Sequence, residues 1–132
     1  MKTRSMLTLE DCKKISAAAE AEAKKNNWNV AIAILDAGGH LLMFQKLDGT
    51  QPGSVKVAIG KATTALNFKR PTKMMEDLAS TRPVFLAVEG LVPIQGGLPV
   101  MVDDQLIGSV GVSGVKSNED EQVAQAAINV LK

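Results

Sequence analysis

Apolar and polar residues follow two kinds of pattern along this chain, one typical of strands and one typical of helices. Residues 30–47 and 97–114 each contain an apolar run, a turn rich in Asp and Gly, and a second apolar run. This pattern is typical of two adjacent antiparallel strands. A long segment with helical periodicity separates the two hairpins, and further helical segments flank them, so we expect the four strands to form one sheet that helices cover.

The strand with the strongest pattern is Val30–Leu35, which is apolar at six consecutive positions. An uninterrupted apolar run indicates burial on both faces, so this strand is predicted at the centre of the sheet. The turn Asp-Ala-Gly-Gly at 36–39 allows positive φ angles, and residues 40–47 are expected to return alongside. Between Arg82 and Gly97 the pattern is irregular, and we expect only a short edge strand at Val92–Ile94.

The last predicted strand, Leu106–Ser113, has sides of different depth. Side chains alternate along a strand, which places Leu106, Gly108, Val110 and Val112 on one side. The other side carries Ile107, Ser109, Gly111 and Ser113. From Ser109 onward this second side has almost no bulk. We therefore expect either a helix backbone or a flat ligand to lie close against Ser109 and Gly111.

Four helices are predicted from apolar residues at steps of three and four. Thr8 is the expected cap of the first helix, and Ser54 that of the second, whose stripe is made largely of small residues. A shorter helix is expected over Thr72–Ala79, after Pro71. A terminal helix is expected to begin at a cap formed by Ser117 or Asn118.

Composition narrows the class of protein. A length of 132 residues predicts a single domain over 1–132 that can bury its own core. The balance of 15 Lys and Arg against 14 Asp and Glu, with few aromatic residues, argues against a nucleic-acid partner. No run is long enough to span a membrane, no apolar signal segment is evident, and Cys12 is the only cysteine, so we expect a cytoplasmic protein without membrane contact.

Candidate chemistry centres on His40, the only histidine. Its ring is expected beside Asp36, where it would either ligate haem iron or shuttle a proton, or else act as a turn residue that hydrogen-bonds the backbone. One His and one Cys cannot form a zinc site within one chain, so no metal site is predicted. Cys12 lies on an apolar helical stripe and is expected to be an inert buried thiol.

Four segments resemble the GlcG/HbpS-like family. They are residues 22–44 (EAKKNNWNVAIAILDAGGHLLMF), 60–65 (GKATTA), 96–114 (GGLPVMVDDQLIGSVGVSG) and 120–127 (DEQVAQAA). The resemblance covers nearly the whole chain, and the family includes haem-binding proteins and the C-terminal domain of some corrinoid adenosyltransferases. It implies a profilin-like α+β domain, an antiparallel sheet of about five strands with helices packed against it, and assembly into a homo-oligomer, a tetramer or an octamer.

Two basic residues coincide with positions that resemble the family pattern. Lys61 lies in the second predicted helix, and Arg82 precedes the segment that leads to Gly96 and Gly97. A guanidinium and the backbone amides of a glycine turn can together hold a carboxylate, from a small acid or from a haem propionate. No pair of carboxylates suited to acid–base catalysis is evident, so no catalytic residue is assigned.

The leading hypothesis is a homo-oligomeric protein that binds a small ligand, with haem as the first candidate cofactor and a corrinoid left open. The alternatives are an enzyme or accessory protein acting on a small hydroxy or oxo acid in glycolate or diol metabolism, and an assembly protein without a ligand. In haem-binding relatives a histidine near the first helix is implicated. The corresponding helix here reads AAAEAEAKK and contains no imidazole.

Overall fold

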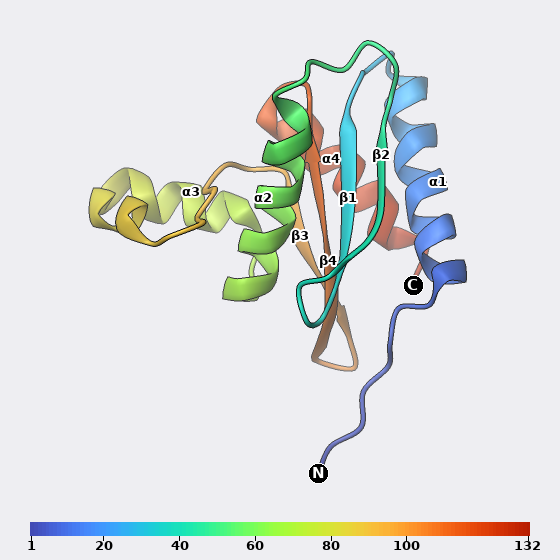
Figure 1. Cartoon of the computed structure of the whole chain (residues 1–132), viewed down its shortest axis with the longest axis horizontal. Coiled ribbons are helices and arrows are strands. Elements are labelled where there is room, and N and C mark those ends of the chain that lie inside the picture. Colours follow the sequence, from blue (N-terminus) through green and yellow to red (C-terminus); the bar gives the residue numbers. More distant parts are fainter.

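The computed structural model describes all residues from 1 to 132 and shows helices on both faces of one antiparallel sheet (Figure 1). The strands are β1 (Ala31–Asp36), β2 (Leu41–Lys46), β3 (Gly97–Val102) and β4 (Gln105–Ser113), in the spatial order β2-β1-β4-β3. The helices are α1 (Leu9–Lys25), α2 (Ser54–Phe68), α3 (Thr72–Thr81), α4 (Ser117–Asn129) and the short 3-10 helix η1 (Pro83–Ala87). Helices α1 and α4 cover one face and α2 covers the other. The α+β prediction is confirmed, with four strands instead of about five.

The prediction of an edge strand at Val92–Ile94 is wrong. The Val92 N–H donates to the Oγ1 atom of Thr64 in α2 over 2.9 Å, and Pro93 has no N–H to offer a ladder. This segment is therefore held against a helix, and β3 remains the edge of the sheet. Pro99 lies in β3, an edge strand, where a residue without an N–H is tolerated.

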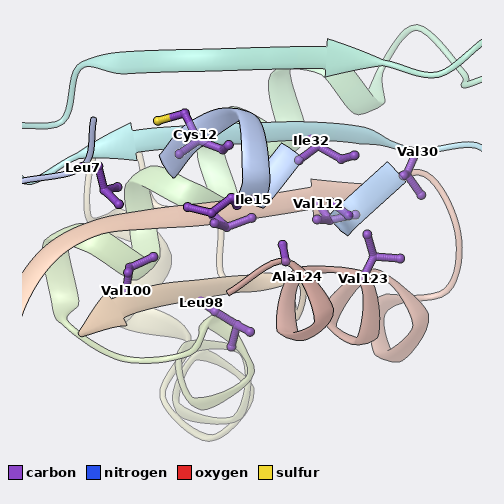
Figure 2. Packing of buried hydrophobic residues seen from close by; sticks show 14 of the residues in the cluster. Leu7, Cys12, Ile15, Val30, Ile32, Leu98, Val100, Val112, Val123 and Ala124 are labelled. Carbon is purple, nitrogen blue, oxygen red and sulfur yellow. The ribbon is translucent and has the colours of Figure 1, made fainter. Parts of the chain in front are cut away.

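The central position of β1 is confirmed, because it pairs with β2 on one side and β4 on the other. Its side chains alternate between two cores. Ile32 and Ile34, with Val30 just before the strand, face the larger core under α1 and α4, to which Ile15, Val112 and Val123 also belong (Figure 2). Ala31, Ala33 and Leu35 face a smaller, alanine-rich core under α2. Burial on both faces explains the uninterrupted apolar run.

A β-bulge corrects the alternation predicted for β4. Val100 pairs with Gly108 and Met101 pairs with Leu106, so Ile107 has no partner in β3. The extra residue reverses the faces at this point: Ile107 belongs to the larger core, while Leu106 packs against the smaller one. Side chains from Gly108 onward alternate as predicted.

The shallow side of β4 lies directly under α2. The Ser109 hydroxyl donates to the Ala62 carbonyl over 2.7 Å, and a Cβ added at Gly111 would lie 2.5 Å from the Ala62 nitrogen and closer still to the Ala58 carbonyl oxygen. The sequence was compatible with either a helix backbone or a flat ligand against Ser109 and Gly111, and the structure has the backbone of α2 there. No space for a flat ligand remains on this side of Gly111 within the chain.

The predicted helices are all present, although two of their caps differ. Thr8 caps α1, because its hydroxyl accepts from the Asp11 N–H over 3.1 Å. Ser54 and Ser117 are the first residues of their helices and not the caps. At α4 the Glu119 carboxylate accepts from the Lys116 N–H instead.

The segment formed by α3 and η1, residues 72–87, projects from the body of the molecule (Figure 1). We call this segment the arm. The start of α3 is joined to the sheet through Thr72, which is fully buried and whose hydroxyl accepts from the Gly97 N–H. No helix in the structure is both long and apolar enough to cross a membrane.

Candidate functional site

A hollow of about 400 Å³ lies beside His40 at one end of the sheet, within the range of small-molecule sites. Three parts of the chain form it: the N-terminal residues before α1, the turn between β1 and β2, and one residue each of β2 and β4 on the same face of the sheet. Its lining residues are Arg4, Ser5, Met6, Leu7, Asp36, Ala37, Gly38, His40, Leu42 and Ile107. The hollow is therefore apolar on one wall and carries an imidazole and a guanidinium.

The turn that presents His40 is organised by Asp36. One oxygen of its carboxylate accepts from the backbone N–H groups of Gly38 and His40, each over 2.9 Å. These hydrogen bonds hold the pKa of Asp36 below its ordinary value, and the bond from the His40 N–H has the largest effect. Gly39 has a φ of 87°, which favours glycine and lets the chain reverse. The sequence Asp-Ala-Gly-Gly thus forms its turn by local chemistry alone.

The same carboxylate also orients the His40 ring. The Nδ1 atom lies 3.1 Å from the Asp36 Oδ1 atom, which confirms the predicted contact between these side chains. Because an ionised carboxylate only accepts, Nδ1 is the protonated nitrogen of the neutral His40 ring, and in that form Nε2 carries the lone pair. Nε2 has no hydrogen-bond partner, and the side chain is 79% exposed. A histidine held by a carboxylate in this way is the usual arrangement of a metal-ligating imidazole.

Lys61, Gly96 and Gly97 are brought together, but inside the protein. The Lys61 Nζ donates to the Asp120 carboxylate over 3.0 Å and to the Val112 carbonyl over 2.9 Å. A Cβ on Gly96 would lie 2.8 Å from this Nζ, and the Gly97 N–H donates to the Thr72 hydroxyl. The Lys61 ammonium is therefore already paired with the protein's own carboxylate, and the Gly97 N–H with the Thr72 hydroxyl.

Asp120 was not singled out from the sequence. Burial raises the pKa of its carboxyl group, and the neighbouring Lys61 and the Val115 N–H lower it in part. Its position in the first turn of α4 gives no sign of a partner in α2. Only the packing of α4 over β4 brings the two side chains together.

Arg82 does not join this cluster. It ends α3 in the arm, is exposed, and places its guanidinium carbon 5.2 Å from the centre of the Phe85 ring. Ten residues of helix, about 15 Å, separate it from Thr72, which contacts Gly97. The chain thus does not assemble Lys61, Arg82 and the glycine turn into one carboxylate site.

Cys12 is buried in the larger core, as predicted, and burial raises the pKa of its thiol. Six residues that line the hollow were not expected there from the sequence: Arg4, Ser5, Met6, Leu7, Leu42 and Ile107. Arg4, Met6 and Leu7 precede the first helix and show no periodicity. The bulge in β4 decides the direction of Ile107, so no sequence pattern indicates that it lines the hollow.

Comparison with known proteins gives concordant results. Residues 7–129 match the family model described as haem degrading protein HbpS-like. Protein GlcG of Escherichia coli strain K12 is 43% identical over 114 residues, which cover 86% of this chain and 85% of that protein. A double mutant of Streptomyces reticuli HbpS superposes with a TM-score of 0.93 at 31% identity, covering 100% of this chain and 91% of that one. The crystal structure of the PduOC:heme complex superposes with a TM-score of 0.89 at 27% identity, covering 95% of this chain and 94% of that one.

Proposed function

This chain belongs to the HbpS-like family, and from that premise we propose that it binds haem in the hollow beside His40, with the Nε2 atom of His40 as the iron ligand. The observation that carries the proposal is the Asp36–His40 pair, which leaves Nε2 free and exposed. A structural neighbour solved as a heme complex supports haem as the ligand.

The residues of the hollow fit this group. Met6, Leu7, Leu42 and Ile107 offer an apolar wall for a flat macrocycle, and Arg4 offers a cation for a carboxylate. The Asp36 carboxylate keeps the His40 ring in the tautomer that ligation requires. Bound haem would supply an iron for redox or oxygen chemistry, while the chain's own residues hold, orient and shield it.

We expect titration with hemin to give a saturable Soret shift with one equivalent per chain in the wild type. His40→Ala should abolish the shift, because no other imidazole exists in the chain. Asp36→Asn keeps the imidazole but weakens its orientation, so hemin affinity should fall about 10- to 100-fold, the usual effect of losing a carboxylate behind a ligating histidine. Circular dichroism of both variants checks that the fold is retained. A Soret shift in His40→Ala equal to that of the wild type would contradict this assignment.

The alternative of an enzyme acting on a small hydroxy or oxo acid depended on Lys61 and Arg82. The ion pair of Lys61 with Asp120 and the distance along α3 to Arg82 leave that site unassembled within the chain. Similarity to GlcG extends over 86% of the chain and identifies no residue that would act on such an acid.

We also propose that the protein is a homo-oligomer, a tetramer or an octamer, that associates through the arm. Large apolar side chains along and just after the arm are exposed: Met74, Val84, Leu86, Val88 and Ile94. Val84 and Leu86 are more than 60% exposed, although η1 is the most apolar part of the arm. Clustered apolar side chains on a surface that the rest of the chain leaves uncovered are typical of a protein–protein interface.

Leu86→Asp should therefore shift the protein toward the monomer, because burying the new charge in an apolar interface is unfavourable. Size-exclusion chromatography with light scattering measures the mass. Leu9→Asp is the matched control, because Leu9 is 61% exposed and lies on α1, away from the arm. An unchanged mass for Leu86→Asp, or an equal loss of mass for Leu9→Asp, would contradict association through the arm.

A further inference from the structure

A second hollow, of about 580 Å³, adjoins the one beside His40 and shares Arg4 and Ala37 with it. Its other lining residues are Lys2, Thr3, Lys69, Asp104, Gln105 and Leu106. The two hollows differ in character. The His40 hollow has the apolar wall, whereas the second hollow is lined mainly by polar and charged side chains, and Arg4 stands at their boundary.

The charge of the second hollow is predominantly positive. Lys2, Arg4 and Lys69 contribute three cations, against the single carboxylate of Asp104. All three basic residues are exposed, and none of them forms an ion pair or a side-chain hydrogen bond within the chain. Three other surface lysines, Lys24, Lys25 and Lys73, are instead paired with carboxylates on their own helices. We call Lys2, Arg4 and Lys69 the basic rim.

The position of the basic rim is fixed by elements from distant parts of the sequence. Lys69 ends α2 in the left-handed conformation, with a φ of 54°. Arg4 lies in the N-terminal segment that Leu7 anchors, because the Leu7 side chain is buried in the larger core. The β3–β4 turn brings Asp104 and Gln105 to the same place.

We propose that the basic rim binds the carboxylates of a flat apolar ligand whose body lies in the His40 hollow, so that the site selects tetrapyrrole acids over their uncharged esters. The inference rests on the proposed haem site and adds the group that decides its specificity. A guanidinium binds a carboxylate through two parallel hydrogen bonds, and two ammonium groups nearby raise the local positive potential. The shared residue Arg4 lets one ligand use both hollows.

Three probes separate the rim from the iron ligand. Hemin carries iron and two carboxylates, protoporphyrin IX carries the carboxylates without iron, and hemin dimethyl ester carries iron without free carboxylates. Fluorescence quenching and Soret titration give the affinity of each probe for the full-length protein. We expect hemin and protoporphyrin IX to depend on the basic rim, and hemin and its ester to depend on His40.

The double variant Arg4→Gln/Lys69→Gln should bind hemin and protoporphyrin IX about tenfold more weakly, the effect of losing two exposed charge pairs. Its affinity for the ester should stay unchanged. The matched control is Lys13→Gln/Lys46→Gln, which removes the same charge from two exposed lysines that are likewise unpaired and that lie outside both hollows. Raising the salt concentration from about 0.1 M to about 1 M should weaken binding of the acids only.

Equal affinity of the wild type for hemin and its ester, or equal losses in the rim and control variants, would overturn the inference and leave the haem proposal standing. A second outcome is that the rim variant weakens protoporphyrin IX binding while His40→Ala leaves hemin binding unchanged. That result would support the basic rim and overturn His40 as the iron ligand. Failure of the wild type to bind any of the three probes would overturn both.

Discussion

Lys61→Met is expected to destabilise the protein by about 3–5 kcal/mol at neutral pH, the usual effect of removing one partner of a buried ion pair. Lys61 is 1% exposed and Asp120 2%, and their charged atoms lie 3.0 Å apart. Methionine replaces most of the apolar stem but removes the ammonium group. Asp120 then lies buried as a carboxylate without a counterion. Urea denaturation measures the free energy of unfolding.

The loss should depend on pH. Burial already raises the pKa of Asp120, and Lys61 limits that rise, so Lys61→Met should raise it further. A group whose pKa is higher in the folded state than in the unfolded chain contributes stability at low pH and loses it as the pH rises. The free energy of unfolding of the variant should therefore fall more steeply than that of the wild type as the pH rises above about 4, the ordinary pKa of an aspartate.

A second substitution provides the control. Lys61→Met/Asp120→Asn should recover part of the stability at neutral pH, because a neutral amide needs no counterion and still accepts from the Val115 N–H. The double variant should also lose the added pH dependence. Unchanged stability of Lys61→Met at neutral pH, or an equal loss in the single and double variants, would show that the pair has no such role.

Gly111→Ala is expected to lower the free energy of unfolding by about 3 kcal/mol, at the upper end for overpacking of a core. Its Cβ would lie 2.5 Å from the Ala62 nitrogen and would also collide with the Ala58 carbonyl oxygen. Backbone atoms of a helix cannot turn aside as a flexible side chain does. Helix α2 must move away from β4, which weakens the alanine-rich core and the Ser109 hydrogen bond. Thermal and urea denaturation measure the effect.

Gly53→Ala is the matched control. Gly53 precedes α2 with a φ of −60°, and no atom lies within 4 Å of a Cβ added there. The stability of this variant should be unchanged or raised by about 0.5 kcal/mol, because alanine restricts the unfolded chain. Equal stability of Gly111→Ala and Gly53→Ala would mean that the close approach of α2 to β4 is not sterically required.

The fold was largely predictable because its signals are local. The apolar run at Val30–Leu35 indicated a doubly covered strand, and the stripes of three and four residues indicated the helices. The wrong predictions occur where a contact with a residue distant in the sequence determines the local structure. The edge strand at Val92–Ile94 is replaced by a bond to Thr64, and the alternation at Ile107 is reversed by a bulge against β3.

The sequence by itself determined the elements, the tight turn and the Asp36–His40 pair, because each depends on residues within a few positions of one another. Only the tertiary structure decided that Asp120, 59 positions away, neutralises Lys61, and that α2 fills the shallow side of β4. It also placed Arg4 and Lys69 at one rim. Such pairings depend on how whole helices and strands pack, and the periodicity of a single segment carries no information about which distant side chain it will meet.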